Sequence, residues 1–237
     1  MHDSHPSHIP SSAELFSSAE LDPALQALLE TAYPWQILAK LDIFLAQLTK
    51  SHHEAGSSVH PSAVLTGPVY LAAGASIGAH ALIEGPAWLG RGAQVGHGAY
   101  LRGGVVLAAS AKVGHSSEVK HALLLPQASA PHFNYIGDSI VGRGCNLGAG
   151  VKLANFHSLG QAIYVAGQAT GLRKLGAILG DGVMIGCNAV LAPGTIVGAE
   201  SIVYSGALLR GIYPAKTVIK VRQTQQQSER LPQKNSR

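Results

Sequence analysis

A histidine stands where a regular sequence pattern stops. The segment SAPHFNYIGD, residues 129–138, places His132 directly after Pro131 and shortly before Tyr135. Imidazole has an unperturbed pKa near neutrality, so a histidine can take up and return a proton at physiological pH. His132 is therefore a candidate general base, although a histidine that only hydrogen-bonds the surrounding loop fits the same segment. The residues alone leave both roles open.

The elements that would position this histidine follow a period of six residues. From Val59 to Leu125, every sixth residue is Val, Ile or Leu, which makes twelve positions without exception. The period resumes in two new phases after the histidine segment, at Val141, Leu147 and Leu153, and then at Leu179, Ile185, Leu191, Val197, Val203 and Leu209. Such a period indicates a short strand and a turn, repeated so that each rung buries its neighbour's face.

Glycine often follows the aliphatic residue, as in Ile77-Gly78, Leu89-Gly90 and Val113-Gly114. This [Leu/Ile/Val]-Gly-x-x-x-x unit resembles the hexapeptide repeat of left-handed β-helix acyltransferases. The resemblance implies a mainly β fold, a left-handed parallel β-helix in which three hexads close one triangular coil. Residues eighteen apart would then stack on successive coils, and residues 59–209 would form a prism roughly 40 Å tall.

The histidine segment should interrupt this prism. Pro131 has no amide proton for a strand ladder, so we expect residues 126–135 to leave the wall as a loop. Loops on rigid scaffolds carry function more often than the elements they connect.

Two cations precede the histidine segment at coil spacing. Arg102 and Lys120 are eighteen residues apart, each directly after an inward aliphatic residue, and should lie one above the other. Like charges opposed on a sheet are destabilising, so the pair favours an anion such as a phosphate between them. Glu84, one coil below Arg102, offers the alternative that it neutralises the arginine.

His97 and His115 are also eighteen apart, which raises a second class of enzyme. A metal held between them would resemble the γ-type carbonic anhydrases of the same fold, which need a third histidine from another subunit. The spacing of His80 and His121 does not match that pattern. A solvated histidine column is the interpretation we adopt, with no metal site.

The chain divides into three parts. Residues 1–58 are expected as a tail, a helical segment over 11–50 and a polar linker, with Ser11 or Ser12 capping the first helix. Residues 59–222 form the β-helix, and residues 223–237 are a flexible tail with little to bury.

Composition restricts the function classes. The 237 residues are 46 % hydrophobic and 13 % charged, with a net charge of +4 that suits an anionic small molecule better than nucleic acid. The two cysteines make no disulfide framework, and no apolar run is long enough for a signal or a membrane span. We expect a cytoplasmic protein.

Over residues 60–222, the motifs AYLRGG, EVK, APHFNYIGD, CNLGAG and IGCNAVLAPGTIVG resemble the acetyltransferase domain of the bifunctional glucosamine-1-phosphate N-acetyltransferase/UDP-N-acetylglucosamine pyrophosphorylases. The resemblance implies an acetyl-CoA-dependent N-acetyltransferase acting on an amino-sugar phosphate, with His132 as catalytic base. It implies a homotrimer with active sites between prisms. Its substrate-binding residues would be Arg102, Lys120, Tyr135, Asn146 and Asn155, and its acetyl-CoA-binding residues Ala149, Cys187, Ser205 and Arg222.

The chain departs from that family in two places. Phe156 follows Asn155 where the family has tyrosine, and the connection over residues 157–176 is longer, with AIYVAG and TGLRK suggesting a hairpin arm. Both lie where the acceptor would bind. A sugar-phosphate or sugar-nucleotide binding protein without catalysis, even one carrying a uridyltransferase name by family inheritance, is therefore the alternative function.

Overall fold

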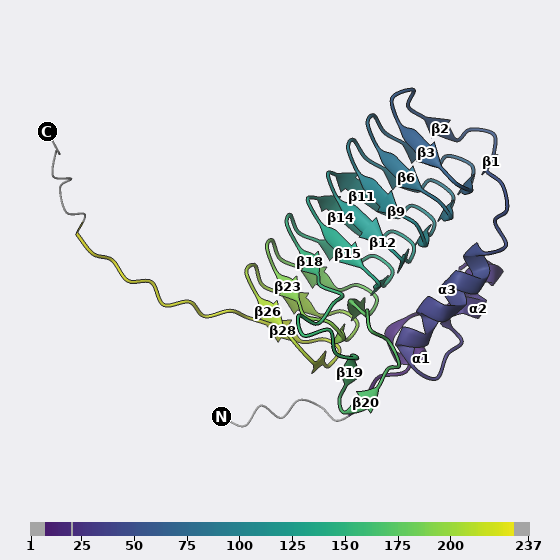
Figure 1. Ribbon diagram of the computed structural model, residues 1–237. Coiled ribbons are helices and arrows are strands. Elements are labelled where there is room, and N and C mark those ends of the chain that lie inside the picture. The colour runs from purple at the N-terminus through teal and green to yellow at the C-terminus, as the bar shows by residue number, and fades with distance from the viewer. Residues whose placement is uncertain (1–7, 20, 230–237) are drawn as a thin grey trace, which may run out of the picture.

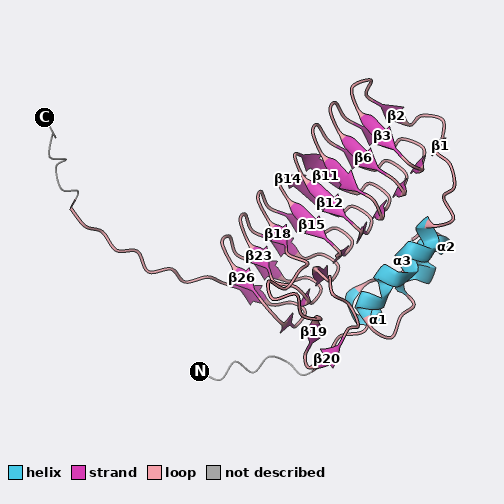
Figure 2. Ribbon diagram, in the orientation of Figure 1, coloured by secondary structure: helices cyan, strands magenta, loops and turns pink. Residues whose placement is uncertain are grey.

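The protein is a three-sided column of short parallel strands with a helical segment along one side (Figures 1 and 2). This computed structural model describes residues 8–19 and 21–229. The helical elements precede the column along the chain. They are α1 (Ser12–Leu15), α2 (Pro23–Leu29), the 3-10 turn η1 (Pro34–Gln36) and α3 (Ile37–Leu45).

Sheet A has nine strands in the order β1-β4-β7-β10-β13-β16-β21-β24-β27. Their bounds are His52–His53, Val69–Leu71, Ala87–Leu89, Val105–Leu107, Ala122–Leu124, Ile140–Val141, Ala177–Leu179, Thr195–Val197 and Ile212–Tyr213. The first of these strands lies in the segment 51–58 that was expected as a linker. Its His53 occupies a hexad position without an aliphatic residue because it is exposed at the open end of the column.

Sheet B has nine strands in the order β2-β5-β8-β11-β14-β17-β22-β25-β28. Their bounds are Ser58–Val59, Ser76–Ile77, Gln94–Val95, Lys112–His115, Ser129–His132, Asn146–Leu147, Met184–Ile185, Ile202–Val203 and Val218–Ile219. Sheet C has eight, β3, β6, β9, β12, β15, β18, β23 and β26. Their bounds are Val64–Thr66, Leu82–Glu84, Tyr100–Arg102, Glu118–Lys120, Tyr135–Gly137, Lys152–Leu153, Val190–Leu191 and Leu208–Leu209.

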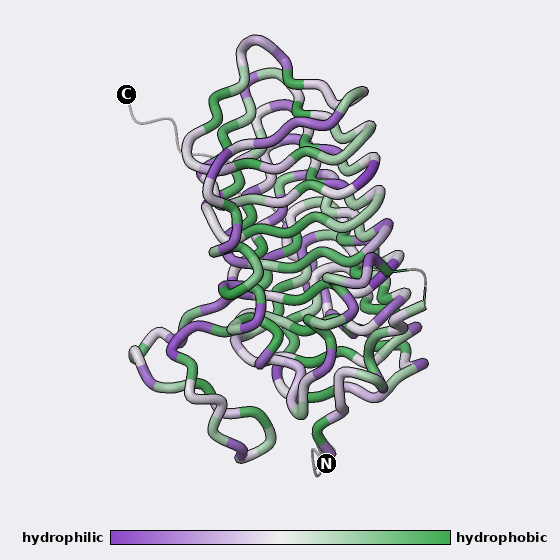
Figure 3. Tube along the Cα trace, turned by 90° about the vertical axis from the view of Figure 1, so that its right-hand side faces the viewer, coloured by the Kyte–Doolittle hydropathy of each residue, from purple (hydrophilic) through white to green (hydrophobic). Residues whose placement is uncertain are grey.

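The aliphatic residues of the hexads meet inside the column, as the repeat predicted. Leu71, Ile83, Leu101 and Leu179 are 0 % exposed and belong to one continuous core. Figure 3 shows hydrophobic stretches recurring from coil to coil up the column. Parallel stacking of this kind buries each rung against its neighbours, so the core grows with every coil.

The coil length changes in the middle of the column. Tyr70 pairs with Trp88, eighteen positions on, but Val106 pairs with Leu123, seventeen positions on. The inward residue therefore comes one position early, and it is Leu124 that joins the inner core. The prediction that Leu125 faces inward was wrong, because Leu125 points outward into a second core.

That second core lies between sheet A and the helices. It joins Trp35, Leu38 and Leu41 to outward residues of sheet A, among them Leu123 and Ile178. Ser11, one of the two serines predicted to cap the first helix, caps α1 with a capping box to Glu14. No helix in the described ranges combines the length and the apolar character that crossing a bilayer requires.

The long connection between β18 and β21 carries an antiparallel hairpin, β19 (Tyr164–Val165) and β20 (Gln168–Ala169). This confirms the hairpin arm expected from AIYVAG. Its Ile163 and Val165 are buried in the second core, so the arm is packed against the body of the molecule.

Candidate functional site

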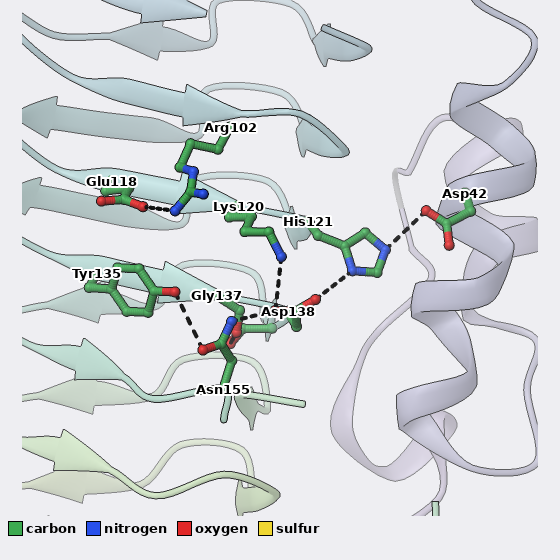
Figure 4. Close-up of polar contacts among 10 residues, drawn as sticks. Asp42, Arg102, Glu118, Lys120, His121, Tyr135, Gly137, Asp138 and Asn155 are labelled. Atoms are coloured by element: carbon green, nitrogen blue, oxygen red, sulfur yellow. Dashed lines mark hydrogen bonds and ion pairs between the residues drawn. The ribbon is translucent and has the colours of Figure 1, made fainter. Parts of the chain in front are cut away.

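An open pocket of about 300 Å³ lies on sheet C, near its edge with sheet A. Its lining combines three cationic side chains with a phenol, an amide and a phenyl ring. The lining residues are Arg102, Lys120, Tyr135, Asn155, Phe156 and Lys174. Four of the five side chains predicted to bind substrate thus meet in one place, and Figure 4 shows these four on neighbouring rungs.

Arg102 and Lys120 stack on successive coils, as their spacing predicted. Tyr100 pairs with Glu118 and Leu101 with Val119, so the next residues of the two strands face each other. Arg102 is not neutralised by Glu84, which lies opposite it on the coil below. Its Nη1 instead donates a 2.8 Å hydrogen bond to Glu118 Oε1, and this bond raises the pKa of the guanidinium.

Tyr135 and Asn155 form the polar floor of the pocket. The Tyr135 hydroxyl donates to Asn155 Oδ1 over 3.4 Å, and burial followed by nearby carboxylates raises the pKa of the phenol. The Asn155 amide lies over Gly137, where an added Cβ would come 2.5 Å from Asn155 Nδ2. The glycine at this position is therefore what lets Asn155 reach across the rung.

Asp138 is a site residue that the sequence analysis missed. It is 5 % exposed, and its Oδ2 accepts a hydrogen bond from Asn155 Nδ2 and lies 3.7 Å from Lys120 Nζ. Burial alone would raise the pKa of this carboxyl, but hydrogen bonds from His121 and Asn155 and the charge of Lys120 outweigh it and lower the pKa. The signal was obscured because His121, Asp138 and Asn155 are seventeen apart, not eighteen.

Phe156 and Lys174 come from the two ends of the hairpin arm. Their backbones form an antiparallel bridge that closes the base of the arm beside the pocket. Phe156, one of the two departures from the family pattern, therefore lines the pocket and is 47 % exposed. Arg173, the other basic residue of the arm, is exposed and does not line the pocket.

His132 is not in a protruding loop. It ends β14, which pairs with β11 in sheet B, with Ala130 opposite Val113 and His132 opposite His115. The prediction of a loop over residues 126–135 was wrong. His132 is exposed and lies before the corner leading into sheet C, outside the residues that line the pocket.

The strand loses one ladder hydrogen bond at Pro131, and a neighbouring side chain supplies two other bonds beside it. At the equivalent position two coils earlier, Gly96 N donates to Val113 O; Pro131 has no N–H with which to make the corresponding bond to Leu147 O. Asn134, which is 2 % exposed, compensates: its Oδ1 accepts from His132 N over 3.0 Å, and its Nδ2 donates to Gly148 O over 2.8 Å.

The residues expected to bind acetyl-CoA continue upward from His132 at the same corner. Gly150 N donates to His132 O, Asn188 N to Ala149 O, and Gly206 N to Cys187 O, so successive coils bring these positions into line. We call the line of His132, Ala149, Cys187 and Ser205 the corner column. Cys187 and Ser205 are exposed on it, and Ala149 is half-buried.

Two further residues of the predicted site, one for the substrate and one for the coenzyme, lie outside the pocket. Asn146 is in β17 of sheet B, opposite Ser129, and does not line the pocket. Arg222 is exposed in the extended segment beyond β28. Lys220, two residues before Arg222, has its Nζ 5.9 Å from the centroid of the Tyr204 ring.

The histidines below His132 form a stacked row. The His97 and His115 rings stack with centroids 5.2 Å apart, and His80 meets His97 edge-on at 5.5 Å. Within residues 8–19 and 21–229, no group of three or more His, Cys, Asp or Glu side chains is arranged to hold a metal ion.

The fold and its repeats define the class of protein, a parallel β-helix built from hexapeptide repeats. Residues 176–211 match the model of the bacterial transferase hexapeptide (six repeats), and residues 83–173 match that of the GMPPB C-terminal domain. The second match contains the whole pocket except Lys174. The predicted resemblance to hexapeptide-repeat transferases is therefore confirmed.

The relatives are more particular. Over 96 residues the chain is 36 % identical to a bifunctional sugar-1-phosphate nucleotidylyltransferase/acetyltransferase of Sulfurisphaera tokodaii, a match covering 39 % of this chain and 24 % of the relative. It is 35 % identical over 95 residues to the bifunctional protein GlmU of Methanococcus maripaludis, covering 39 % of this chain and 23 % of that one. The matched stretch is thus about a quarter of either relative, and the resemblance to the bifunctional acetyltransferases is confirmed over that stretch.

Solved structures with a related outline include the UDP-N-acetylglucosamine acyltransferase of Francisella novicida. It is 15 % identical, with 71 % of this chain and 66 % of that chain covered and a TM-score of 0.39. The acetyltransferase domain of PglB from Neisseria gonorrhoeae is 14 % identical, with 77 % and 60 % covered and a TM-score of 0.25. At these TM-scores neither likeness bears on the activity of this chain.

Proposed function

We propose that the protein is an acetyl-CoA-dependent N-acetyltransferase acting on an amino-sugar phosphate such as glucosamine-1-phosphate. The observation that carries the proposal is the meeting of Arg102, Lys120, Tyr135 and Asn155 in one open pocket. Guanidinium and ammonium groups at adjacent rungs are suited to phosphate oxygens, and the phenol and amide beside them are suited to sugar hydroxyls.

The cationic side chains of the pocket remain able to bind an anion, although Arg102 is in an ion pair. Arg102 and Glu118 form an exposed ion pair, with side chains 42 % and 34 % exposed, and such pairs contribute little stability. A phosphate can therefore compete for the guanidinium at low cost. Lys174 at the mouth adds a third positive charge from the arm.

The corner column supports the assignment of the acyl donor. Strand spacing of about 4.8 Å places Ala149, Cys187 and Ser205 on the three coils beyond His132, along a line that ends about 14 Å from it. An extended thioester-bearing chain fits such a line of small side chains. Acetyl-CoA lying there would bring its carbonyl toward His132, with Arg222 available to the distal phosphate.

The reaction then needs one proton acceptor. The amine nitrogen attacks the thioester carbonyl, a carbon–nitrogen bond forms and the carbon–sulfur bond breaks, and CoA leaves as a thiolate that takes up a proton. An ammonium has no lone pair, so the amine must lose a proton, and His132 is the residue proposed to accept it.

His132 lies outside the pocket of its own chain, and we propose a homotrimer that brings a neighbouring chain across the site. Active sites between chains would unite the pocket on sheet C with a corner column. The free thiols of Cys145 and Cys187 suit the reducing cytoplasm, where we place the protein.

The test is release of CoA thiol from acetyl-CoA with glucosamine-1-phosphate as acceptor. His132→Ala should abolish turnover and leave the oligomer intact. His80→Ala, which removes an exposed imidazole from the same row of histidines, should retain turnover. A His132→Ala variant with an unchanged rate would remove His132 from the mechanism.

A second candidate is a sugar-phosphate binding protein without catalysis. The observation favouring it is that the proposed general base lies outside the pocket, while Phe156 places an apolar ring at the pocket wall. Binding of the sugar phosphate with no thiol release across a panel of amino sugars would establish this alternative.

A further inference from the structure

A chain of charged contacts leads from the pocket to the N-terminal helices. Buried Asp138 holds two pocket residues, Lys120 and Asn155, through its Oδ2. Its Oδ1 accepts a 2.9 Å hydrogen bond from His121 Nδ1. The other ring nitrogen of His121, Nε2, lies 3.0 Å from Asp42 Oδ1 in α3. Figure 4 shows this line running from the sheet across to the helix.

The two carboxylates select one state of His121. A neutral imidazole carries a single N–H and would turn a lone pair toward one of the two aspartates. An imidazolium has an N–H for each. The Asp138 contact is a hydrogen bond, whereas the Nε2 contact to Asp42 is an ion pair whose N–H is not aligned for a hydrogen bond. The charged groups facing the ring are Asp42, Asp138 and Lys120, and chiefly the bond to Asp138 raises the pKa of His121.

On the sheet side of this chain of contacts, the turns that carry His121 and Asp138 are held by hydrogen bonds. His121 and Asp138 occupy the same corner on successive coils, both with positive φ, 45° and 44°. Asp138 N donates to Lys120 O, and Ser139 Oγ donates to Gly137 O, so the turn carrying the carboxylate is fixed. On the helix side the contact is less constrained, because the Asp42 side chain is 66 % exposed.

We propose that Asp138 is a positioning residue of the acceptor pocket, and that the Asp42–His121 contact makes the affinity of the pocket depend on docking of the N-terminal helices. The identity of the pocket ligand rests on the proposed function; the coupling itself does not. The Asp42 carboxylate of α3 pairs with the imidazolium, the imidazolium donates to Asp138, and Asp138 orients Lys120 and Asn155.

The experiment measures His121 and the pocket separately. Nuclear magnetic resonance titration of the imidazole gives the pKa of His121 in the wild type, Asp42→Asn and Asp138→Asn. Steady-state kinetics gives KM for glucosamine-1-phosphate and for acetyl-CoA. Glu200→Gln is the control, since it removes a carboxylate from an exposed ion pair with Lys216 near the far end of the column.

Asp42→Asn should lower the pKa of His121 and raise KM for the sugar phosphate about two- to fivefold, the ratio expected from one exposed ion pair. Asp138→Asn should raise KM for the sugar phosphate more than about tenfold, as loss of a charge-assisted hydrogen bond does. KM for acetyl-CoA should not change in either variant, and Asp42→Glu should recover most of the affinity. Glu200→Gln should behave as the wild type.

Equal KM values in Asp42→Asn and wild type, with a lowered His121 pKa, would overturn the coupling. Higher turnover in Asp42→Asn would also overturn it, since the helix would then obstruct the pocket. If the wild type acetylates no amino-sugar phosphate, the proposed function fails by itself. The coupling is then judged by the Kd of inorganic phosphate, which Asp42→Asn should raise by the same ratio and Glu200→Gln should not.

Discussion

Asn134 offers a sharp test of how the column accommodates a proline in its wall. Asn134→Ala removes the acceptor for His132 N and the donor for Gly148 O. Each part-buried backbone group left without its partner costs about 1–1.5 kcal/mol, so the variant should lose about 2–3 kcal/mol of unfolding free energy. For a chain of this size that corresponds to a fall in Tm of about 5–10 °C.

Thermal unfolding followed by circular dichroism measures this loss. Asn134→Asp keeps the acceptor for His132 N but buries an unpaired carboxylate against Gly148 O, so its Tm should fall at least as far as that of Asn134→Ala. Gln94→Ala, on the exposed face of the same sheet, is the control and should stay within about 0.5 kcal/mol of the wild type. An Asn134→Ala variant as stable as Gln94→Ala would refute the reasoning, and the strand would have to tolerate Pro131 without compensation.

Three further predictions follow from burial and charge. Leu41→Ala, at a residue 0 % exposed between α3 and sheet A, should cost about 3 kcal/mol in urea denaturation. Folding raises the pKa of His121, so the stability that His121 contributes is complete below about pH 6.5 and is lost as the pH rises through the folded-state pKa. Folding lowers the pKa of Asp138, so the stability that Asp138 contributes is present above about pH 4 and is lost on acidification. The urea midpoint should fall on both sides of this window, and Asp138→Asn should flatten the profile. Burial raises the pKa of Cys145 to about 12, so a thiol reagent should modify exposed Cys187 alone in the native protein, and Cys187→Ser should abolish the reaction.

The column could be predicted from the sequence because its signal is local and repeated. Each hexad requires an aliphatic residue that points inward and a turn after it. The same pattern therefore predicts the inward position of Leu101 and of Ile185, and both lie in the inner core. The same argument placed Lys120 on the coil directly above Arg102, since stacking follows from position in the coil. Where coils keep a constant length, spacing along the chain is enough to bring side chains together.

The errors lie where the coil length changes. A coil of seventeen residues moves the inward position from Leu125 to Leu124. The next inward residue is therefore Ala130 and not Pro131. A run of three leucines at 123–125 satisfies either phase, so the hydrophobic pattern could not reveal the slip. The expected loop at Pro131 followed from that error.

The contacts made by the helices and by the arm could not have been found by spacing alone. Asp42 reaches His121 only through the packing of α3 on sheet A, a tertiary contact with no counterpart in the repeat. Lys174 joins the pocket through the arm, whose path depends on burial of Ile163 and Val165. Such contacts depend on the docking of irregular segments, for which the hexads carry no information.

The most direct measurement of the central claim is a crystal structure of the protein with acetyl-CoA and glucosamine-1-phosphate. The account predicts the phosphate within hydrogen-bond distance of Arg102 and Lys120, the sugar amine directed toward His132 of one chain of a trimer, and the pantetheine along Cys187 and Ser205. A sugar phosphate bound away from the two stacked cations, or a donor bound away from the corner column, would contradict it.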